Sequence, residues 1–143
     1  MFSRKVYLMA IQLSINVRNA RLDAIETAVG TSAVLKIRTG AQPATCATAD
    51  SGAVLATFNL DSDWMAAASS GTKAKAGTWQ DTSADNAGTA DHFRLYASDG
   101  VTCHMQGSVS ATGGGGDIEL DNDVIGSGQQ VTITSFTLTD GNA

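Results

Sequence analysis

The spacing of apolar residues changes once along the chain, from a helical repeat to the alternation of β-strands, and the change falls at Gly30. Before that point the apolar positions recur at mostly three- and four-residue spacing: Ile15, Leu22, Ile25 and Val29. This spacing predicts an amphipathic helix of about 14 residues. Ser14 or Asn16 can cap its start, and Gly30 stands where a left-handed C-cap is wanted. The residues after Gly30 alternate instead, so we expect a mainly β fold with one N-terminal helix.

The other side of this helix is polar, which is typical of a face that lies in solvent or against a partner. It carries Arg18, Asn19, Arg21, Asp23 and Glu26. A helix that precedes a β domain is free to dock on a neighbour. We therefore divide the chain into an N-terminal arm and helix, residues 1–30, and a single β domain, residues 31–143.

Short alternating segments and turn signals fill the rest of the chain and predict about seven or eight strands. They lie at 33–38, 54–60, 72–80, 92–97, 101–109, 117–124 and 130–139. Strands of this length and spacing favour a jelly roll or a β-sandwich. Segments 39–52 and 81–91 are rich in small and polar residues and are expected to be exposed loops, and 61–68 is expected to contain a short helical turn.

The strands at 92–97 and 101–109 are expected to form a hairpin, and their apolar faces determine its register. A three-residue loop at 98–100 pairs Leu95 with Cys103 and keeps both apolar sets on one face, whereas a two-residue turn would separate them. This register places Cys103 inside and His104 outside, opposite Arg94.

Two further features mark the C-terminal third. In 130–139 the apolar residues change from odd-numbered to even-numbered positions, which predicts a bulge near Thr134 and Ser135. The four glycines at 113–116 lack the Lys-Ser/Thr ending of a phosphate loop and precede a strand, so they are interpreted as a flexible turn.

Composition places the chain among folded domains and disfavours two classes of partner. The 143 residues fit one domain with a single core, and 43% hydrophobic against 16% charged residues is typical of a folded chain. The net charge of −5 predicts no basic surface for nucleic acid or for an anionic membrane. The longest apolar run, 6–13, is much shorter than the roughly 20 residues that span a bilayer.

The start of the chain allows two interpretations. Arg4 and Lys5 followed by the apolar run resemble the beginning of a signal peptide, but no small-residue cleavage site follows before Arg18, so a signal peptide is disfavoured. The natural start is either Met1 or Met9, and this alternative stays open.

Candidate catalytic and zinc-binding residues each have a simpler structural interpretation. Cys46 and Cys103 match no zinc spacing and are expected to be reduced, with one long-range disulfide as an alternative. His92, Cys103 and His104 do not suit one ion, because Cys103 and His104 point to opposite faces of a strand. No G-x-S-x-G motif occurs. We therefore predict no catalytic residue, no cofactor and no enzymatic activity.

A row of carboxylates is the calcium candidate of the sequence: Asp117, Glu119, Asp121 and Asp123. Oxygen ligands two residues apart on a strand would need a neighbouring loop to complete the coordination shell. The simpler interpretation is a solvated row that blocks edge pairing, so no metal is predicted. Trp64, Trp79 and Tyr96 show no ordered stripe and are expected to be core or interface anchors.

Three stretches resemble a family of small structural proteins of tailed phages and prophages. They are VRNARLDAIE at 17–26 with LKIRTG at 35–40, GTADHFRLY at 88–96, and TITSFT at 132–137. The resemblance covers most of the chain from Met9 onward and brings no catalytic residue with it. It implies a virion component, and specifically a capsid cement or decoration protein of jelly-roll type that clamps neighbouring major capsid subunits.

The expected function is therefore that of a non-enzymatic virion protein, made in the host cytoplasm and located in the head. Its expected partners are the major capsid protein and copies of itself, with contacts through the N-terminal arm and helix and through the loops 39–52 and 81–91. One alternative is a structural protein of the tail, baseplate or fibre. A second alternative is a carbohydrate- or calcium-binding β-sandwich module.

Overall fold

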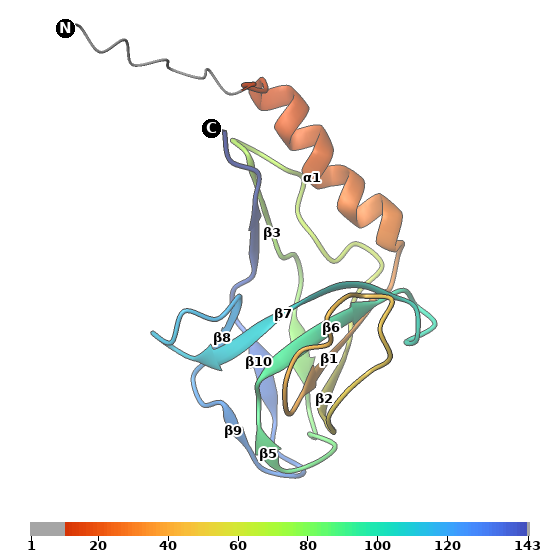
Figure 1. Cartoon of the computed structure of the whole chain (residues 1–143), viewed down its shortest axis with the longest axis vertical. Coiled ribbons are helices and arrows are strands. Elements are labelled where there is room, and N and C mark those ends of the chain that lie inside the picture. Colours follow the sequence, from red (N-terminus) through yellow and green to blue (C-terminus); the bar gives the residue numbers. More distant parts are fainter. Residues whose placement is uncertain (1–10, 143) are drawn as a thin grey trace, which may run out of the picture.

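The computed structural model describes residues 11–142, and in that part of the chain one helix precedes a set of short strands (Figure 1). The helix α1 spans Ile15–Val29. As expected, Ser14 caps its start by accepting a hydrogen bond from the Val17 N–H at 3.3 Å, and Gly30 ends it with a φ of 92°. The apolar run 6–13 and the alternative starts lie wholly or partly outside the described residues.

The strands occupy most of the predicted segments but are shorter and more numerous. They are β1 (Val34–Arg38), β2 (Val54–Asn59), β3 (Thr72–Ala74), β4 (Trp79–Asp81), β5 (Gly88–Thr89), β6 (His92–Tyr96), β7 (Cys103–Ala111), β8 (Ile118–Leu120), β9 (Val124–Ile125), β10 (Val131–Ile133) and β11 (Thr137–Thr139).

One curled sheet forms the main layer of the body. It contains five strands in the order β2-β1-β6-β7-β8, and it is mixed because β7 and β8 pair in parallel while the other neighbours are antiparallel. Three two-stranded ribbons, β10-β4, β11-β3 and β5-β9, complete the β structure of the described residues. The prediction of a mainly β fold with one N-terminal helix is confirmed, but the half-barrel and its ribbons are not a clear jelly roll.

The core lies between this sheet and the ribbons, and an aromatic chain connects the two. Trp79 lies 6.2 Å from Trp64 and 5.4 Å from Phe136, and Phe136 meets Phe93 of β6 edge-on at 6.0 Å, all between ring centroids. The Trp64 indole donates to the carbonyl of Gly30 at 2.9 Å, so its polar atom is satisfied in the core. The prediction that Trp64 and Trp79 are core anchors is confirmed.

The predicted bulge near Thr134 and Ser135 is present as a break in a long ribbon. Pairing between β11 and β3 stops after Thr137 with Ala74, and pairing between β10 and β4 resumes at Ile133 with Trp79. Four residues, 75–78, therefore oppose three, 134–136. The extra residue lies on the opposing segment, and the interruption divides the predicted strands 72–80 and 130–139 into β3 and β4 and into β10 and β11.

The predicted helical turn at 61–68 is wrong. The segment is extended: Met65 bridges Lys75, and Ser69 bridges Thr72 across a two-residue turn. Both central residues of that turn, Ser70 and Gly71, have positive φ values of 53° and 73°, which a type I′ hairpin requires. In Figure 1 the ribbon of β3 and β11 and the helix α1 extend together beyond the curled sheet.

The β6–β7 hairpin is present, but its predicted register is wrong by two residues. Leu95 pairs with Met105 rather than with Cys103, and Arg94 pairs with Gln106 rather than with His104. The reason is a longer loop, in which the Asp99 carboxylate accepts hydrogen bonds from the N–H groups of residues 101 and 102, followed by a bulge. The bulge returns the apolar residues of the two strands to the same face of the hairpin, so Leu95 still lies opposite an apolar residue.

The glycines at 113–116 form the connection between β7 and β8. Parallel strands normally need a crossover of a dozen or more residues, but only residues 112–117 separate β7 from β8. The chain therefore folds back tightly over Ser110, whose hydroxyl accepts the Gly116 N–H at 2.9 Å. A Cβ on Gly116 would lie 2.7 Å from the backbone nitrogen of Ser110, so only glycine fits there.

Replacing Gly116 with Ala should therefore destabilise the fold by about 1–3 kcal/mol, because the new methyl group overlaps backbone atoms that cannot move away. Urea unfolding followed by fluorescence measures this change. Gly126→Ala is the matched control, since its Cβ would approach no atom closer than 3.5 Å. Equal stability of the two variants would contradict the tight connection.

Candidate functional site

The polar side chains of β6 are buried, which the alternating sequence pattern did not predict. All five residues of β6 are buried, including His92 and Arg94, each 1% exposed. The cause is the 39–53 loop, which folds over the face of β1, β6 and β7 opposite the core. The outer side of this loop is exposed as expected, but its inner side supplies hydrogen-bond acceptors to the sheet.

Arg94 is the centre of this contact. Its Nη1 donates to the carbonyl of Thr48 at 3.0 Å and to the carboxylate of Asp50, and its Nη2 donates to the carbonyls of Thr45 at 3.1 Å and Cys46 at 2.9 Å. A planar guanidinium suits this task, because its donors are fixed in one plane and reach several acceptors at once.

Asp50 connects Arg94 to the neighbouring strand and to Tyr96. Its carboxylate accepts hydrogen bonds from Arg38 Nη2 at 2.7 Å and from the Tyr96 hydroxyl at 2.8 Å, in addition to the contact with Arg94. Arg38 also donates to the carbonyl of Gly52 at 3.3 Å. We call these four residues, Arg38, Asp50, Arg94 and Tyr96, the Asp50 cluster.

The electrostatics of the Asp50 cluster stabilise its charged carboxylate. Burial raises the pKa of Asp50, but hydrogen bonds from Tyr96 and Arg94 and the charges of the two arginines lower the pKa more, so the net shift is downward. Burial and the hydrogen bond to Asp50 raise the pKa of Tyr96 to about 12. Near neutral pH the carboxylate is thus fully ionised and the phenol fully protonated, and neither group is available for proton transfer.

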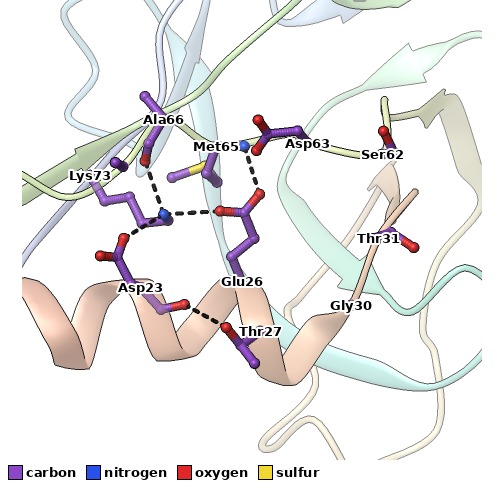
Figure 2. A pocket seen from close by; sticks show the side chains of 11 residues that line it. Asp23, Glu26, Thr27, Gly30, Thr31, Ser62, Asp63, Met65, Ala66 and Lys73 are labelled. Carbon is purple, nitrogen blue, oxygen red and sulfur yellow. Dashed lines mark hydrogen bonds and ion pairs between the residues drawn. The ribbon is translucent and has the colours of Figure 1, made fainter.

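A second buried cation attaches the helix to the β body (Figure 2). Lys73 of β3 has a side chain that is 3% exposed, and its Nζ donates to Asp23 at 2.8 Å, to Glu26 at 2.9 Å and to the carbonyl of Ala66 at 2.9 Å. Burial lowers the pKa of Lys73, but the hydrogen bonds to the two carboxylates raise it above its ordinary value. The amine therefore stays protonated and is not a nucleophile.

The same helical side chains also bind the backbone of the 65–71 segment. Glu26 accepts the Met65 N–H at 3.1 Å, Asp23 accepts the Ala68 N–H at 2.9 Å, and Asn19 accepts the Gly71 N–H at 2.9 Å. These bonds keep the segment extended, which explains why no helical turn forms there. The expectation that these polar residues lie in solvent is therefore wrong for Asn19, Asp23 and Glu26, which bind the body beside the buried Leu22 and Val29.

Contacts near the C-terminus complete the attachment. Arg18 donates to the carbonyl of Asp140 at 3.0 Å, and Arg21 forms an ion pair with the Asp140 carboxylate at 3.2 Å. Leu13 and Asn142 exchange two hydrogen bonds of 2.8 Å each. The helix is thus bound along its length to two segments that lie far from it in sequence.

An open groove of about 770 Å³ lies between the second half of α1 and residues 62–67 (Figure 2). Asp23, Glu26 and Lys73 line it together with small and polar residues. Lys73 is paired with both carboxylates, so this ion group has a net charge of −1 and offers a ligand no unpaired buried cation.

The calcium candidates do not form one row. Only Glu119 lies within a strand, because β8 ends at Leu120. Asp117 accepts the Ser108 N–H at 2.9 Å, and Glu119 accepts the N–H groups of Gly113 and Gly115 at 3.1 and 3.0 Å, so both carboxylates serve the β7–β8 connection. Asp121 and Asp123 follow in the connection to β9.

Within residues 11–142, no group of three or more His, Cys, Asp or Glu side chains is placed to hold a metal ion. His92 lies under the 39–53 loop with Nδ1 at 2.8 Å from the carbonyl of Gly40, whereas His104 is exposed. In the same part of the chain, no helix has the length and apolar character that crossing a membrane requires.

Sequence reasoning missed the Asp50 cluster, although one signal was present. Arg38, His92 and Arg94 occupy predicted strands next to a long loop that contains a single acidic residue, Asp50. Basic residues on a strand without an acidic partner in the same hairpin indicate that a partner comes from elsewhere. The 39–53 loop was the nearest segment that could supply this acidic partner.

Comparison with known proteins does not extend this description. No family model matches the chain, and neither curated proteins nor solved structures include a match. Its function is therefore inferred from its own residues and from the resemblance of its three stretches.

Asp50→Asn should destabilise the protein by about 3 kcal/mol, because two buried guanidinium groups lose their counter-charge. The expected loss in unfolding free energy is moderate because the Asp50 side chain is 37% exposed. Urea unfolding at neutral pH measures the loss. The exposed Asp63→Asn is the control and should stay within about 0.5 kcal/mol of the unsubstituted protein. Equal losses in the two variants would contradict a structural role for the cluster.

The effect of Asp50 should depend on pH. Because its pKa is lower in the folded chain than in the unfolded chain, the carboxylate stabilises the fold above the unfolded pKa, and this contribution disappears as the pH falls through the folded pKa. The stability difference between the unsubstituted protein and Asp50→Asn should be complete at about pH 6 and shrink below about pH 4. Urea midpoints measured at several pH values test this, and a constant difference would refute it.

Lys73→Met should loosen the helix, since it leaves Asp23 and Glu26 without their shared cation. We expect a loss of about 2–4 kcal/mol in unfolding free energy, together with faster proteolysis within α1. Lys75→Met is the control, because the more exposed Lys75 amine binds the carbonyl of Gly77 and lies 5.8 Å from the Trp79 ring centroid but is paired with no carboxylate among the described residues. Equal losses in unfolding free energy and equal rates of proteolysis in the two variants would contradict the role of Lys73 in attaching the helix.

Proposed function

We propose that the chain is a non-enzymatic structural protein of a tailed-phage virion, and specifically a capsid cement or decoration protein that binds the major capsid protein and copies of itself in the head. The resemblance to phage structural proteins supports this proposal. Two of the resembling stretches contain the residues that tie the body together: Asp23 and Glu26 of the helix, and Arg38 and Arg94 of the sheet.

The observation that carries the proposal is the outward face of α1. The helix packs on the body through Leu22, Ile25 and Val29 and the polar residues beside them, so the opposite side is uncovered. Val17, Ala20, Ala24 and Ala28 recur there at three- and four-residue spacing and are exposed. Val17 is 45% exposed, and Ile15 and Ile11 add 40% and 87% exposed apolar side chains at the same end. Contiguous exposed apolar residues mark contact surfaces, and a capsid subunit is the partner that the resemblance indicates.

The chemistry of the buried charges supports a structural role. Arg94 and Lys73 each bind a carboxylate that is remote in sequence, and Arg38, Arg94 and Lys73 each also bind a backbone carbonyl. A cement protein has to keep its shape while many copies act together on one shell, and polar ties of this kind fix loops and helices to the sheet. For the fold, we propose that the ribbons act as the second layer of a sandwich-like body.

A direct test places two charges on the outward helical face. The double variant Val17→Glu, Ala24→Glu should weaken binding to heads that lack the protein by at least about tenfold, because the new carboxylates lose water in the contact. Sedimentation of purified protein with such heads measures the binding. The melting temperature should stay unchanged, since neither side chain packs on the body.

Ser127→Glu is the control, because Ser127 is exposed in a turn that follows β9, and β9 lies away from α1 (Figure 1). It should bind like the unsubstituted protein. Heads decorated with the protein should also survive heating better than bare heads. Localisation of the protein on tails, or equal binding by the double variant, would contradict the proposal.

A further inference from the structure

The 39–53 loop carries one of the two cysteines of the chain to the strand that carries the other. Arg94 Nη2 binds the carbonyl of Cys46 at 2.9 Å and so anchors the backbone of that residue above β6. Two residues farther along β6, Tyr96 pairs with Cys103 of β7. The loop and the strand are therefore fixed relative to each other at the positions of the two cysteines.

The two thiols are neighbours at this point. Burial and the adjoining Cys46 thiol both raise the pKa of Cys103, whose thiol donates a hydrogen bond to the carbonyl of Met105 at 3.4 Å. Both cysteines are free and partly exposed, so a small oxidant can reach them. The Asp50 cluster maintains their proximity without a covalent bond, because it binds the loop on either side of Cys46.

We propose that Cys46 and Cys103 form an intramolecular disulfide when the protein meets a small-molecule disulfide such as oxidised glutathione. One cysteine thiolate attacks a sulfur of the small disulfide, whose S–S bond breaks to release one small thiol. The second cysteine thiolate then attacks the mixed disulfide and releases the other small thiol. The protein loses two electrons and two protons, and the small disulfide gains them.

The surroundings of the pair set the conditions of this reaction. Burial, with the adjoining Cys46 thiol, raises the pKa of Cys103 to about 11, so little of its reactive thiolate exists at neutral pH. The exchange should be slow there and faster at about pH 9. A reducing cytosol would keep the pair open, and an oxidising medium would close it. This chemistry holds whether or not the protein belongs to a virion.

The bond would attach the loop covalently to β7. A cross-link between positions 46 and 103 closes a long loop of the unfolded chain, which reduces the entropy of that state. For a domain of this size the melting temperature should rise by roughly 10 °C.

The experiment uses the full-length protein with oxidised glutathione at about pH 9. We expect both thiols to disappear, the mass to fall by two hydrogen atoms, and peptide mapping to recover Cys46 linked to Cys103 within one chain. The melting temperature should rise and return on reduction with dithiothreitol. Cys46→Ser and Cys103→Ser, treated in the same way, should show no such rise.

Three results would overturn the proposal: thiols that persist after treatment, stable glutathione adducts on both cysteines, or disulfide-linked dimers in place of the internal bond. The mapping on the unsubstituted protein does not depend on the serine variants. It therefore decides the question even if a variant fails to fold.

Discussion

The contact between Arg94 and the 39–53 loop is the interaction on which the rest of the body depends. It lets β6 bury both faces, one against the aromatic core and one under the loop, and so makes β6 the centre of the curled sheet. A buried ion pair is weak evidence of net stability, because the desolvation of its charges offsets much of their attraction. Its effect here is specificity: four acceptors on one guanidinium define a single position for a loop of otherwise small residues.

Lys73 repeats the same arrangement at the other end of the molecule. In both places a buried cation on a strand binds at least one carboxylate from a segment far away in sequence, together with backbone carbonyls. The consequence for the helix is that Asn19, Asp23 and Glu26 bind the body beside the buried Leu22 and Val29. The opposite side, which carries Val17, Ala20, Ala24 and Ala28, faces outward. This arrangement connects the fold to the proposed function, since the side of α1 left for a partner contains exposed apolar residues whose removal from water is favourable.

Local patterns predicted the helix, its caps and the position of most strands, because these depend on neighbours in sequence. The hairpin register was missed because the Asp99 carboxylate stabilises a longer loop than the apolar pattern required. The extended 61–68 segment was missed because its hydrogen-bond partners are side chains of α1, about 40 residues away. The burial of Arg94 escaped prediction for a related reason: alternation assigns polar residues outward and contains no information on a loop that returns to cover them.

The most direct test of this account is a reconstruction of the assembled particle by electron cryomicroscopy. We predict density for the protein on the head, with the Val17 to Ala28 face of α1 buried against a capsid subunit and the 39–53 loop still seated on β6 and β7. Density on the tail, or a head contact made by another surface with this helical face left in solvent, would contradict the account.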